Sequence, residues 1–211
     1  MDDKFLKPYN HQETEDRVYK LWEKSGFFNP DNLPKRHREP FSIVLPPPNA
    51  TGILHVGGAL MVVIEDIIIR YKRMNGFKTL WLPGTDHAAI ATNSKIEKIL
   101  SKEEGKTRYD IGRDAFVAKV EKFVKENRGA LKHQISRMGA SLDWSREAFT
   151  FDEKRNWAVR TAFKKMYDAG LIYRGTRIIN WDPKGQTTIS DDEIIYTERT
   201  SKLYTFKYSE D

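Results

Sequence analysis

Two short apolar runs that flank one long amphipathic segment constrain the fold of this chain more than any other feature of the sequence. The runs are "FSIVL" at residues 41–45 and "FKTLWL" at residues 77–82. Five or six mostly apolar residues bounded by proline or glycine are too few for a helix and are typical of buried strands. Residues 54–74 between them have helical periodicity, which stops at Asn75 and Gly76. Strand, helix and strand within about 45 residues predict a βαβ unit with parallel strands.

Helical periodicity recurs on both sides of this unit, whereas the end of the chain has a different pattern. We predict helices over residues 14–25, 93–104, 114–140 and 152–169. From residue 171 onward, β-branched and aromatic residues alternate with turn residues and predict strands. In the helix over residues 54–74 we expect Ile64, Ile67 and Ile68 to pack on the sheet, because they recur at spacings of three and four.

The composition is that of a rather polar globular protein, with 39% hydrophobic and 31% charged residues in 211. No apolar run approaches the roughly 20 residues that cross a bilayer, and the first residues do not resemble a secretory signal. The chain has no cysteine, which excludes disulfides and thiolate metal sites. We therefore expect a cytoplasmic protein without a membrane segment. The net charge of +6 fits a phosphate-bearing partner, although such an excess is also common on proteins without one.

Two polar segments follow the two predicted strands, at the places where an open α/β sheet binds ligands. They are "PPPNATGILHVGG" at residues 46–58 and "PGTDHAAIATN" at residues 83–93. The helix that starts near Leu54 directs backbone N–H groups and its positive dipole end toward this edge, which suits a phosphate. The residues that we expect to face one crevice are Asn49, Thr51, His55, Asp86 and His87.

Gly57 and Gly58 lie in the first turn of this predicted helix. Without side chains they let a phosphate or a flat ring approach the backbone, or they let the turn pack closely against a neighbouring segment. Taken alone, the two glycines favour the packing interpretation, and only the longer motif in which they lie favours a ligand site.

That longer motif, "PPPNATGILHVGG", resembles the first nucleotide-binding element of class I aminoacyl-tRNA synthetases in the form used by valyl-tRNA synthetases. Further strings resemble the same family in the same order: "IIIRYKRMNGFKTLWLPGTDHAAIAT", "GRDAFVAKV", "SLDWSREAFTFDE" and "GLIYRGTRIINWDPKGQTTISDDEI". The resemblance covers nearly all of the chain. It implies a valine–tRNA ligase that uses ATP with Mg2+ and L-valine to form valyl-adenylate and then charges tRNA(Val).

The resemblance also implies the fold. We expect the first half of a Rossmann-type (HUP-like) parallel sheet with helical segments over residues 1–170. A C-terminal β stalk over residues 171–211 would lead toward the editing insertion of the family. The second catalytic half, the editing core and the anticodon-binding region would then be missing, and the KMSKS string of the family does not occur here.

Site residues follow from the resemblance by position. Those expected around ATP are Thr51, Gly52, His55, Gly57 and Gly58, and those expected in the amino-acid pocket are Pro47, Asn49 and Asp86. Asp86 would pair with the substrate ammonium. His55 would act as the catalytic residue, because it would stabilise charge on the α-phosphate while the substrate carboxylate attacks.

This chain departs from the family at Gly58, where the motif has a second histidine, at residues 61–63 ("MVV"), where polar residues are usual, and at Asn93, which replaces a glutamine. These changes lie in or just after the two polar segments, residues 46–58 and 83–93, which we call the first and second corners of the site. We therefore expect the site to be impaired. A natural relative with a remodelled site, an engineered fragment with a resurfaced cleft and a tolerated polymorphism at Gly58 all remain open. The alternative functions are a non-catalytic or engineered scaffold and a general nucleotide-binding protein, although the latter leaves the later strings unexplained.

Some family members bind zinc beside the segment "NWDPKGQTTISDDE" at residues 180–193. Asp182 and Asp191 lack thiolate or histidine neighbours and would form a poor zinc site. We therefore expect no structural zinc and no other bound metal apart from the magnesium that accompanies ATP.

Overall fold

The computed structural model of this chain describes residues 8–209. Residues 1–7, where we expect no secretory signal, and residues 210–211, the end of the predicted C-terminal strands, lie outside the described part. The chain divides into two compact units, of which the first ends at Ala162 and the second begins at Phe163.

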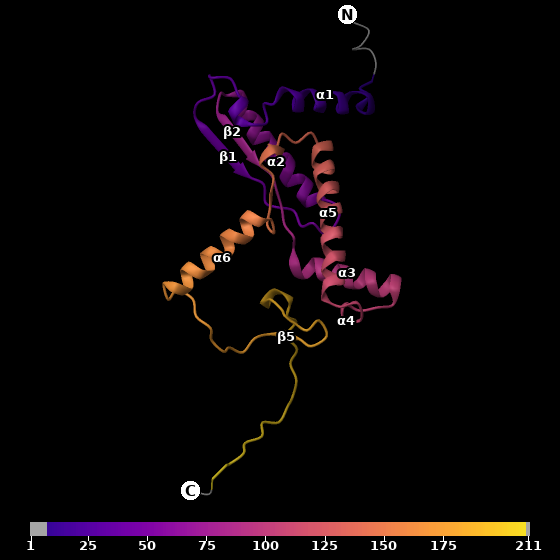
Figure 1. The fold of residues 1–211 in the computed structure, drawn as a ribbon, viewed down its shortest axis with the longest axis vertical. Helices are drawn as coiled ribbons and strands as arrows, with labels where there is room; N and C mark the ends of the chain where they lie inside the picture. Colours follow the sequence, from indigo (N-terminus) through magenta and orange to yellow (C-terminus); the bar gives the residue numbers. More distant parts are fainter. Residues whose placement is uncertain (1–7, 210–211) are drawn as a thin grey trace, which may run out of the picture. The chain divides into compact units, whose positions relative to one another are not determined.

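The predicted βαβ unit is present in the first unit and is confirmed. Strand β1 (Pro40–Val44) leads into helix α2 (Val56–Met74), which returns the chain to strand β2 (Lys78–Leu82) (Figure 1). The two strands pair in parallel along their whole length. The α/β class predicted from the sequence is therefore correct.

Parallel pairing continues beyond β2 on its other side. After Pro83, strand β3 (Gly84–Thr85) pairs in parallel with β4 (Ala148–Phe149). Further backbone bonds extend this edge, since Ala148 N donates to Pro83 O over 3.1 Å. Residues 81–85 thus form a central extended segment, which pairs with β1 on one side and with the segment around β4 on the other.

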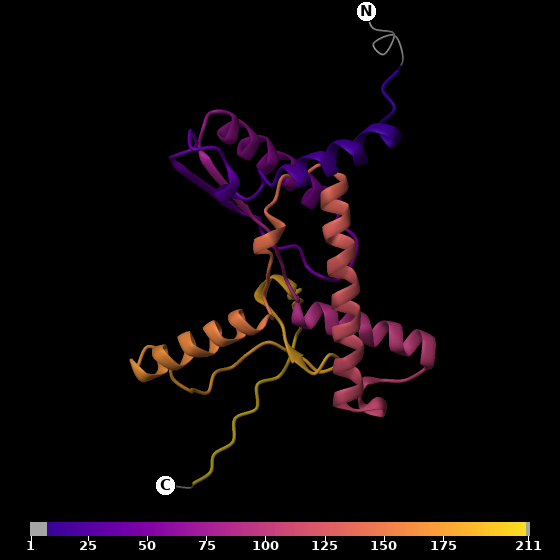
Figure 2. The same cartoon turned by 45° about the horizontal axis from the view of Figure 1, so that its top comes forward.

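Most of the predicted helices are found within about four residues of their expected ends. In both ribbon views α3 crosses α5 (Figures 1 and 2), and α5 also contacts α1. Gly26 ends the first helix in the left-handed conformation, which glycine adopts without strain. The helices are α1 (His11–Ser25), α3 (Ala89–Glu104), α4 (Arg108–Ile111), α5 (Arg113–Arg137) and α6 (Glu153–Asp168), with short 3-10 turns at η2 (Pro30–Asn32), η3 (Trp144–Arg146) and η4 (Asp191–Glu193).

Helix α2 contacts the sheet with a different face from the one we predicted. Ile64 and Ile67 are 50% and 62% exposed, and Ile68 is 39% exposed, so the prediction that they are buried was wrong. Val62 and Ile69 are buried instead. They belong to a core cluster that consists of Leu45, Val62, Ile69, Trp81, Ile135, Ala140 and Leu142.

Polar side chains of α2 explain this orientation, because they point toward the protein and find partners there. Trp81 Nε1 donates to Glu65 Oε2 over 2.8 Å. Asp66 Oδ1 accepts from the backbone and hydroxyl of Ser141, over 2.9 and 2.6 Å. Arg70 bonds to Asp66 and donates to the Gly139 carbonyl. Apolar residues occur on nearly every side of α2, so these polar bonds decide which side faces inward.

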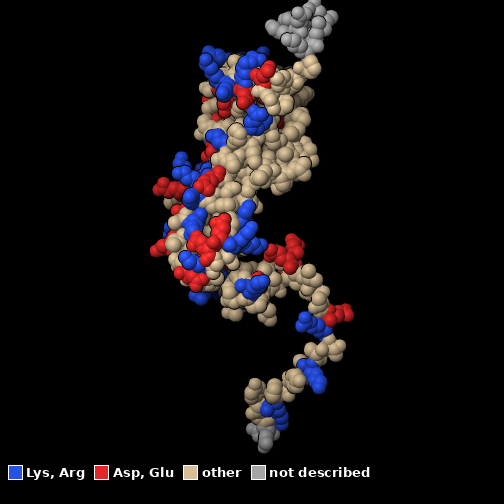
Figure 3. All heavy atoms as spheres, turned by 90° about the vertical axis from the view of Figure 1, so that its right-hand side faces the viewer, with Lys and Arg blue, Asp and Glu red and all other residues tan. Residues whose placement is uncertain are grey.

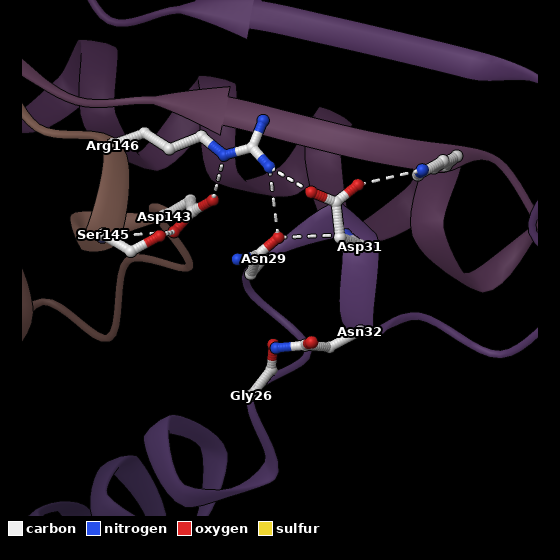
Figure 4. A network of polar contacts seen from close by, with 8 residues as sticks. Gly26, Asn29, Asp31, Asn32, Asp143, Ser145 and Arg146 are labelled. Atoms are coloured by element: carbon white, nitrogen blue, oxygen red, sulfur yellow. Dashed lines mark hydrogen bonds and ion pairs between the residues drawn. The ribbon is translucent and has the colours of Figure 1, made fainter.

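A second polar network joins the loop before β1 to the turn after α5 (Figure 4). Arg146 contacts the carboxylate of Asp31 over 2.5 Å and that of Asp143 over 3.1 Å. Lys78 Nζ approaches the other oxygen of Asp31 to 3.0 Å. The hydrogen bond and charge of Lys78 hold the pKa of Asp31 below its usual value. Because Asp31 is exposed, this network orients the two loops more than it stabilises them.

The second unit contains less regular strand structure than the sequence predicts. Its strands are β5 (Trp181–Asp182) and β6 (Thr187–Thr188), an antiparallel pair closed by Asp182, which accepts from two turn amides. Strand-forming residues such as Ile195 and Leu203 are almost fully exposed. A strand is stable only where neighbours supply hydrogen bonds and cover one face, and the other predicted strands of the described residues have no such neighbours within this unit.

The observed face of α2 predicts unequal costs for two adjacent truncations. Ile69→Ala should destabilise the chain by about 2–5 kcal/mol, because it leaves a cavity in the core, whereas Ile68→Ala should cost less than about 1 kcal/mol. Urea unfolding followed by circular dichroism measures both. Equal costs would mean that α2 lies on the sheet with another face.

Glu65 gives the stability of the chain a predictable pH dependence. Burial raises the pKa of this carboxyl above its ordinary value of 4.5, although the Trp81 hydrogen bond opposes the shift. The folded state therefore favours the protonated form of Glu65. The contribution of Glu65 to the free energy of unfolding is fully present below about pH 4.5 and is lost as the pH rises through the folded-state pKa. Glu65→Gln keeps an acceptor for Trp81 and should flatten this part of the profile. Urea unfolding of both proteins between about pH 4 and 7 measures the difference, which should grow with pH.

Candidate functional site

The two polar segments identified in the sequence meet at one edge of the sheet. Asn49 forms a parallel bridge with Asp86. The amide of Ala50 donates to the Asp86 carbonyl over 2.8 Å, and the Asp86 amide donates to the Pro48 carbonyl over 2.9 Å. A Cβ on Gly84 would lie 3.6 Å from Pro47, so this proline also lies against the second segment. The structure thus places Pro47, Asn49 and Asp86 side by side.

His55 forms the N-cap of α2. Its Nδ1 accepts from the amide of Gly58 over 3.0 Å, and the ring is exposed. In a neutral imidazole one nitrogen accepts and the other donates, so this bond leaves the proton on Nε2. The cap therefore presents a hydrogen-bond donor at the positive end of the helix dipole, where an anion is stabilised.

Two glycines shape the first turn of α2 around this histidine. A Cβ on Gly57 would lie 3.3 Å from His55 Nδ1, so a side chain there would crowd the capping ring. Gly58 is buried, and a Cβ there would lie 2.8 Å from Leu54 Cδ1. Close packing against Leu54 therefore requires the smallest residue at position 58 unless Leu54 moves.

Asp86 and His87 are held by the segment that follows β4. Asp86 Oδ1 accepts from the Ala88 amide over 2.9 Å and from the Thr150 hydroxyl over 3.2 Å. His87 Nδ1 lies 2.6 Å from the same hydroxyl, and its ring stacks on Phe151 at 5.1 Å. The His87 ring is therefore held by Thr150 and Phe151, whereas both protein bonds of the Asp86 carboxylate go to a single oxygen.

Ala88, the N-cap of α3, adopts a left-handed conformation with φ of 48°. A residue with a Cβ pays about 1–3 kcal/mol for such a conformation. The hydrogen bond that its amide donates to Asp86 helps to maintain it. Strained backbone of this kind is concentrated at ligand sites and switch regions, which is consistent with a site at this corner.

Lys95 of α3 also contacts the candidate site, and no sequence motif predicted this contact. Its ammonium donates to the Thr51 carbonyl over 2.5 Å and lies 3.2 Å from the position of a Cβ on Gly52. It thus places an exposed positive charge against the loop formed by Thr51 and Gly52. No sequence signal links Lys95 to a loop more than 40 residues earlier, because only the fold brings α3 to this position.

Core packing accounts for part of the unusual segment at residues 61–63. Val62 is only 2% exposed and belongs to the core, and Met61 packs against that core. Val63 is 44% exposed, and Asn93 is half-buried. The apolar character of Met61 and Val62 therefore has a structural reason in this chain.

Acidic and basic side chains are interleaved on the face drawn in Figure 3, so that face has no continuous positively charged patch. Within residues 8–209, no cluster of three or more histidine, aspartate or glutamate side chains is arranged to hold a metal ion. No helix in the same described range has the length and apolar character that a membrane span requires.

A parallel βαβ unit whose two strand ends carry these motifs at one sheet edge is the architecture expected of a class I aminoacyl-tRNA synthetase. Residues 17–208 match the family model described as tRNA synthetases class I (I, L, M and V), and the chain belongs to this family.

Valine–tRNA ligases are among its most similar relatives. It is 47% identical over 200 residues to the enzyme of Thermotoga maritima, 48% over 202 residues to that of Thermus thermophilus, and 50% over 195 residues to the chloroplastic/mitochondrial valine–tRNA ligase 2 of Arabidopsis thaliana. These matches cover 92–96% of this chain. The chain spans only 20–23% of the length of these relatives.

A solved structure confirms the fold. The LeuRS of Agrobacterium radiobacter, crystallised in a ternary complex with tRNA and LeuAMS, matches with a TM-score of 0.71 and 21% sequence identity. The match covers 89% of this chain and 22% of that chain. The first half of a Rossmann-like catalytic domain, which the sequence predicts, is therefore the architecture observed.

Proposed function

We propose that this chain is the part of a valine–tRNA ligase in which residues 46–58 and 83–93 bind ATP and L-valine for valyl-adenylate formation. The observation that carries the proposal is the bridge between Asn49 and Asp86, because it joins the two motifs at the sheet edge where α/β folds bind ligands. The similarity to valine–tRNA ligases supports the choice of amino acid.

In this proposal ATP, together with Mg2+, lies against the first turn of α2, near Thr51, Gly52, Gly57 and Gly58. The valine carboxylate attacks the α-phosphorus, a new P–O bond forms, and the bond to pyrophosphate breaks. His55 Nε2–H donates to an α-phosphate oxygen as negative charge develops there, which is electrostatic stabilisation by a preorganised donor. The Nδ1 cap fixes the orientation of the ring.

The amino acid would bind next to ATP, with Pro47 and Asn49 on one side and Asp86 on the other. Among the described residues none donates a hydrogen bond to Asp86 Oδ2, which can therefore accept from the valine ammonium. Asp86 is 37% exposed, so the resulting ion pair orients the substrate more than it adds affinity.

We assign the remaining parts of the chain by the same similarity. Residues 1–170 would form the N-terminal half of the catalytic domain, and residues 171–211 would form the stalk toward the editing insertion. We propose tRNA(Val) as the partner of the whole synthetase, the cytoplasm as its location, and no structural zinc in this region.

A second candidate function is a non-catalytic nucleotide-fold scaffold, natural or engineered, and Gly58 favours it. The family motif has a histidine at this position, and here Leu54 occupies part of the space that such a side chain needs. Loss of one preorganised donor costs about 2.7–4 kcal/mol of transition-state stabilisation. We therefore propose that adenylate formation by this chain is impaired.

Valine-dependent exchange of pyrophosphate into ATP separates the two candidates. We expect slow exchange that requires valine and that falls further in His55→Ala. Leucine in place of valine is the matched control. Exchange that stays at background with valine, in a chain shown by circular dichroism to be folded, would support the scaffold instead.

Replacing Gly58 tests the nucleotide site directly. Gly58→His adds a donor at the N-terminus of α2, and a hydrogen bond to a charged group contributes about 1.5–3 kcal/mol, which is roughly 10- to 150-fold in ATP affinity. Because Leu54 lies in the way, the full gain should require Leu54→Ala in the same chain. Calorimetric titration with ATP and magnesium measures it, with Leu54→Ala alone as the control. Affinities that agree within about twofold would show that Gly58 is not the limiting defect.

A further inference from the structure

Helix α5 makes one side-chain contact to each of the two corners of the site, and the sequence motifs include neither of its contact residues. Gln134 Oε1 accepts from the amide of Leu54 over 2.9 Å. Arg128 Nε donates to the hydroxyl of Thr85 over 2.9 Å. Leu54 directly precedes His55, and Thr85 directly precedes Asp86. Each contact therefore fixes the residue immediately before a proposed ligand-binding side chain.

The contact to the first corner holds a backbone group that helix geometry cannot satisfy. Leu54 lies before the N-cap His55, so its amide has no intrahelical acceptor. Gln134 supplies one from a helix 80 positions away along the chain. Leu54 itself packs against the core and against Gly58. The orientation of the His55 cap thus depends on the position of α5.

The contact to the second corner is stronger, because Arg128 is bound on three sides. Its Nη2 bonds to Glu147 over 2.9 Å, and its guanidinium lies 4.2 Å from the ring centre of Phe149. Thr85, which accepts from Nε, is 4% exposed. A planar guanidinium serves several partners at fixed angles, which a lysine cannot do. Arg128 therefore holds the β3–β4 pair at the point where the chain turns into Asp86.

We propose that α5 positions the site, with Gln134 as the positioning residue for the nucleotide corner and Arg128 as the positioning residue for the amino-acid corner. The two residues lie about 9 Å apart along the helix axis, so one rigid element sets both corners relative to each other. This inference rests on the proposed function for its ligands and on the contacts of α5 for its geometry.

Calorimetric titrations with Mg2+–ATP and, separately, with L-valine test the assignment. A misplacement of about 1 Å can cost about 100-fold in reaction rate, and a displaced binding group should weaken ligand binding as well. We expect Gln134→Met to weaken ATP binding by about 10-fold or more and to leave valine within about twofold. Arg128→Met should do the reverse. Gln134→Glu, which keeps an acceptor oxygen, should recover most of the ATP affinity, and Lys125→Met, on an exposed part of α5, should change neither ligand.

Amide hydrogen exchange on the same proteins provides a readout that does not depend on the ligands. Gln134→Met should speed exchange over residues 54–59 and spare residues 84–87, and Arg128→Met should do the opposite. If each variant loosens both corners equally, or neither, α5 has no corner-specific role and the inference fails. A different outcome would be that each variant speeds exchange only at its own corner, as expected, while the parent chain binds neither ATP nor valine. The proposed function and the ligand assignments would then fail, but the structural coupling of α5 to each corner would remain.

Discussion

The parallel backbone pairing that runs from β1 and β2 past the ends of these strands is the interaction on which the rest of the structure depends. It continues through the bridge between Asn49 and Asp86, so the two segments that leave the sheet stay in contact after the strands end. Backbone hydrogen bonds hold this contact whatever side chains the segments carry. Substitutions such as Gly58 can therefore alter the chemistry of the corners while the corners keep their places.

Helix α2 is oriented by its polar residues, which is the reverse of an ordinary surface helix. Glu65 and Asp66 find partners on Trp81 and Ser141, and a buried carboxylate without a partner would cost more than an exposed isoleucine. The outer face of α2 consequently carries Ile64 and Ile67 in contact with water.

Residues outside the sheet hold the two corners of the site in place. Thr150 and Phe151 hold the turn at Asp86 and His87, and Lys95 holds the loop at Thr51. These residues come from two places far apart in the sequence, and each approaches one corner through a side chain. The motifs alone would be short flexible turns, and their definite geometry comes from these neighbours.

The sequence by itself determined the βαβ unit, the family and the candidate residues at the two corners. Strand length, helix-ending glycine and strand-to-helix motifs are local signals, and local signals survive in any fold that contains them. Tertiary structure decided the face of α2, because apolar residues occur on nearly every side of that helix and its polar bonds to Trp81, Ser141 and Gly139 select the side that faces inward. It also decided that residues such as Ile195 and Leu203 form no regular strand, since a strand depends on neighbours that its own sequence cannot supply. The contacts of Lys95, Arg128 and Gln134 with the corners likewise exist only once the helices have packed.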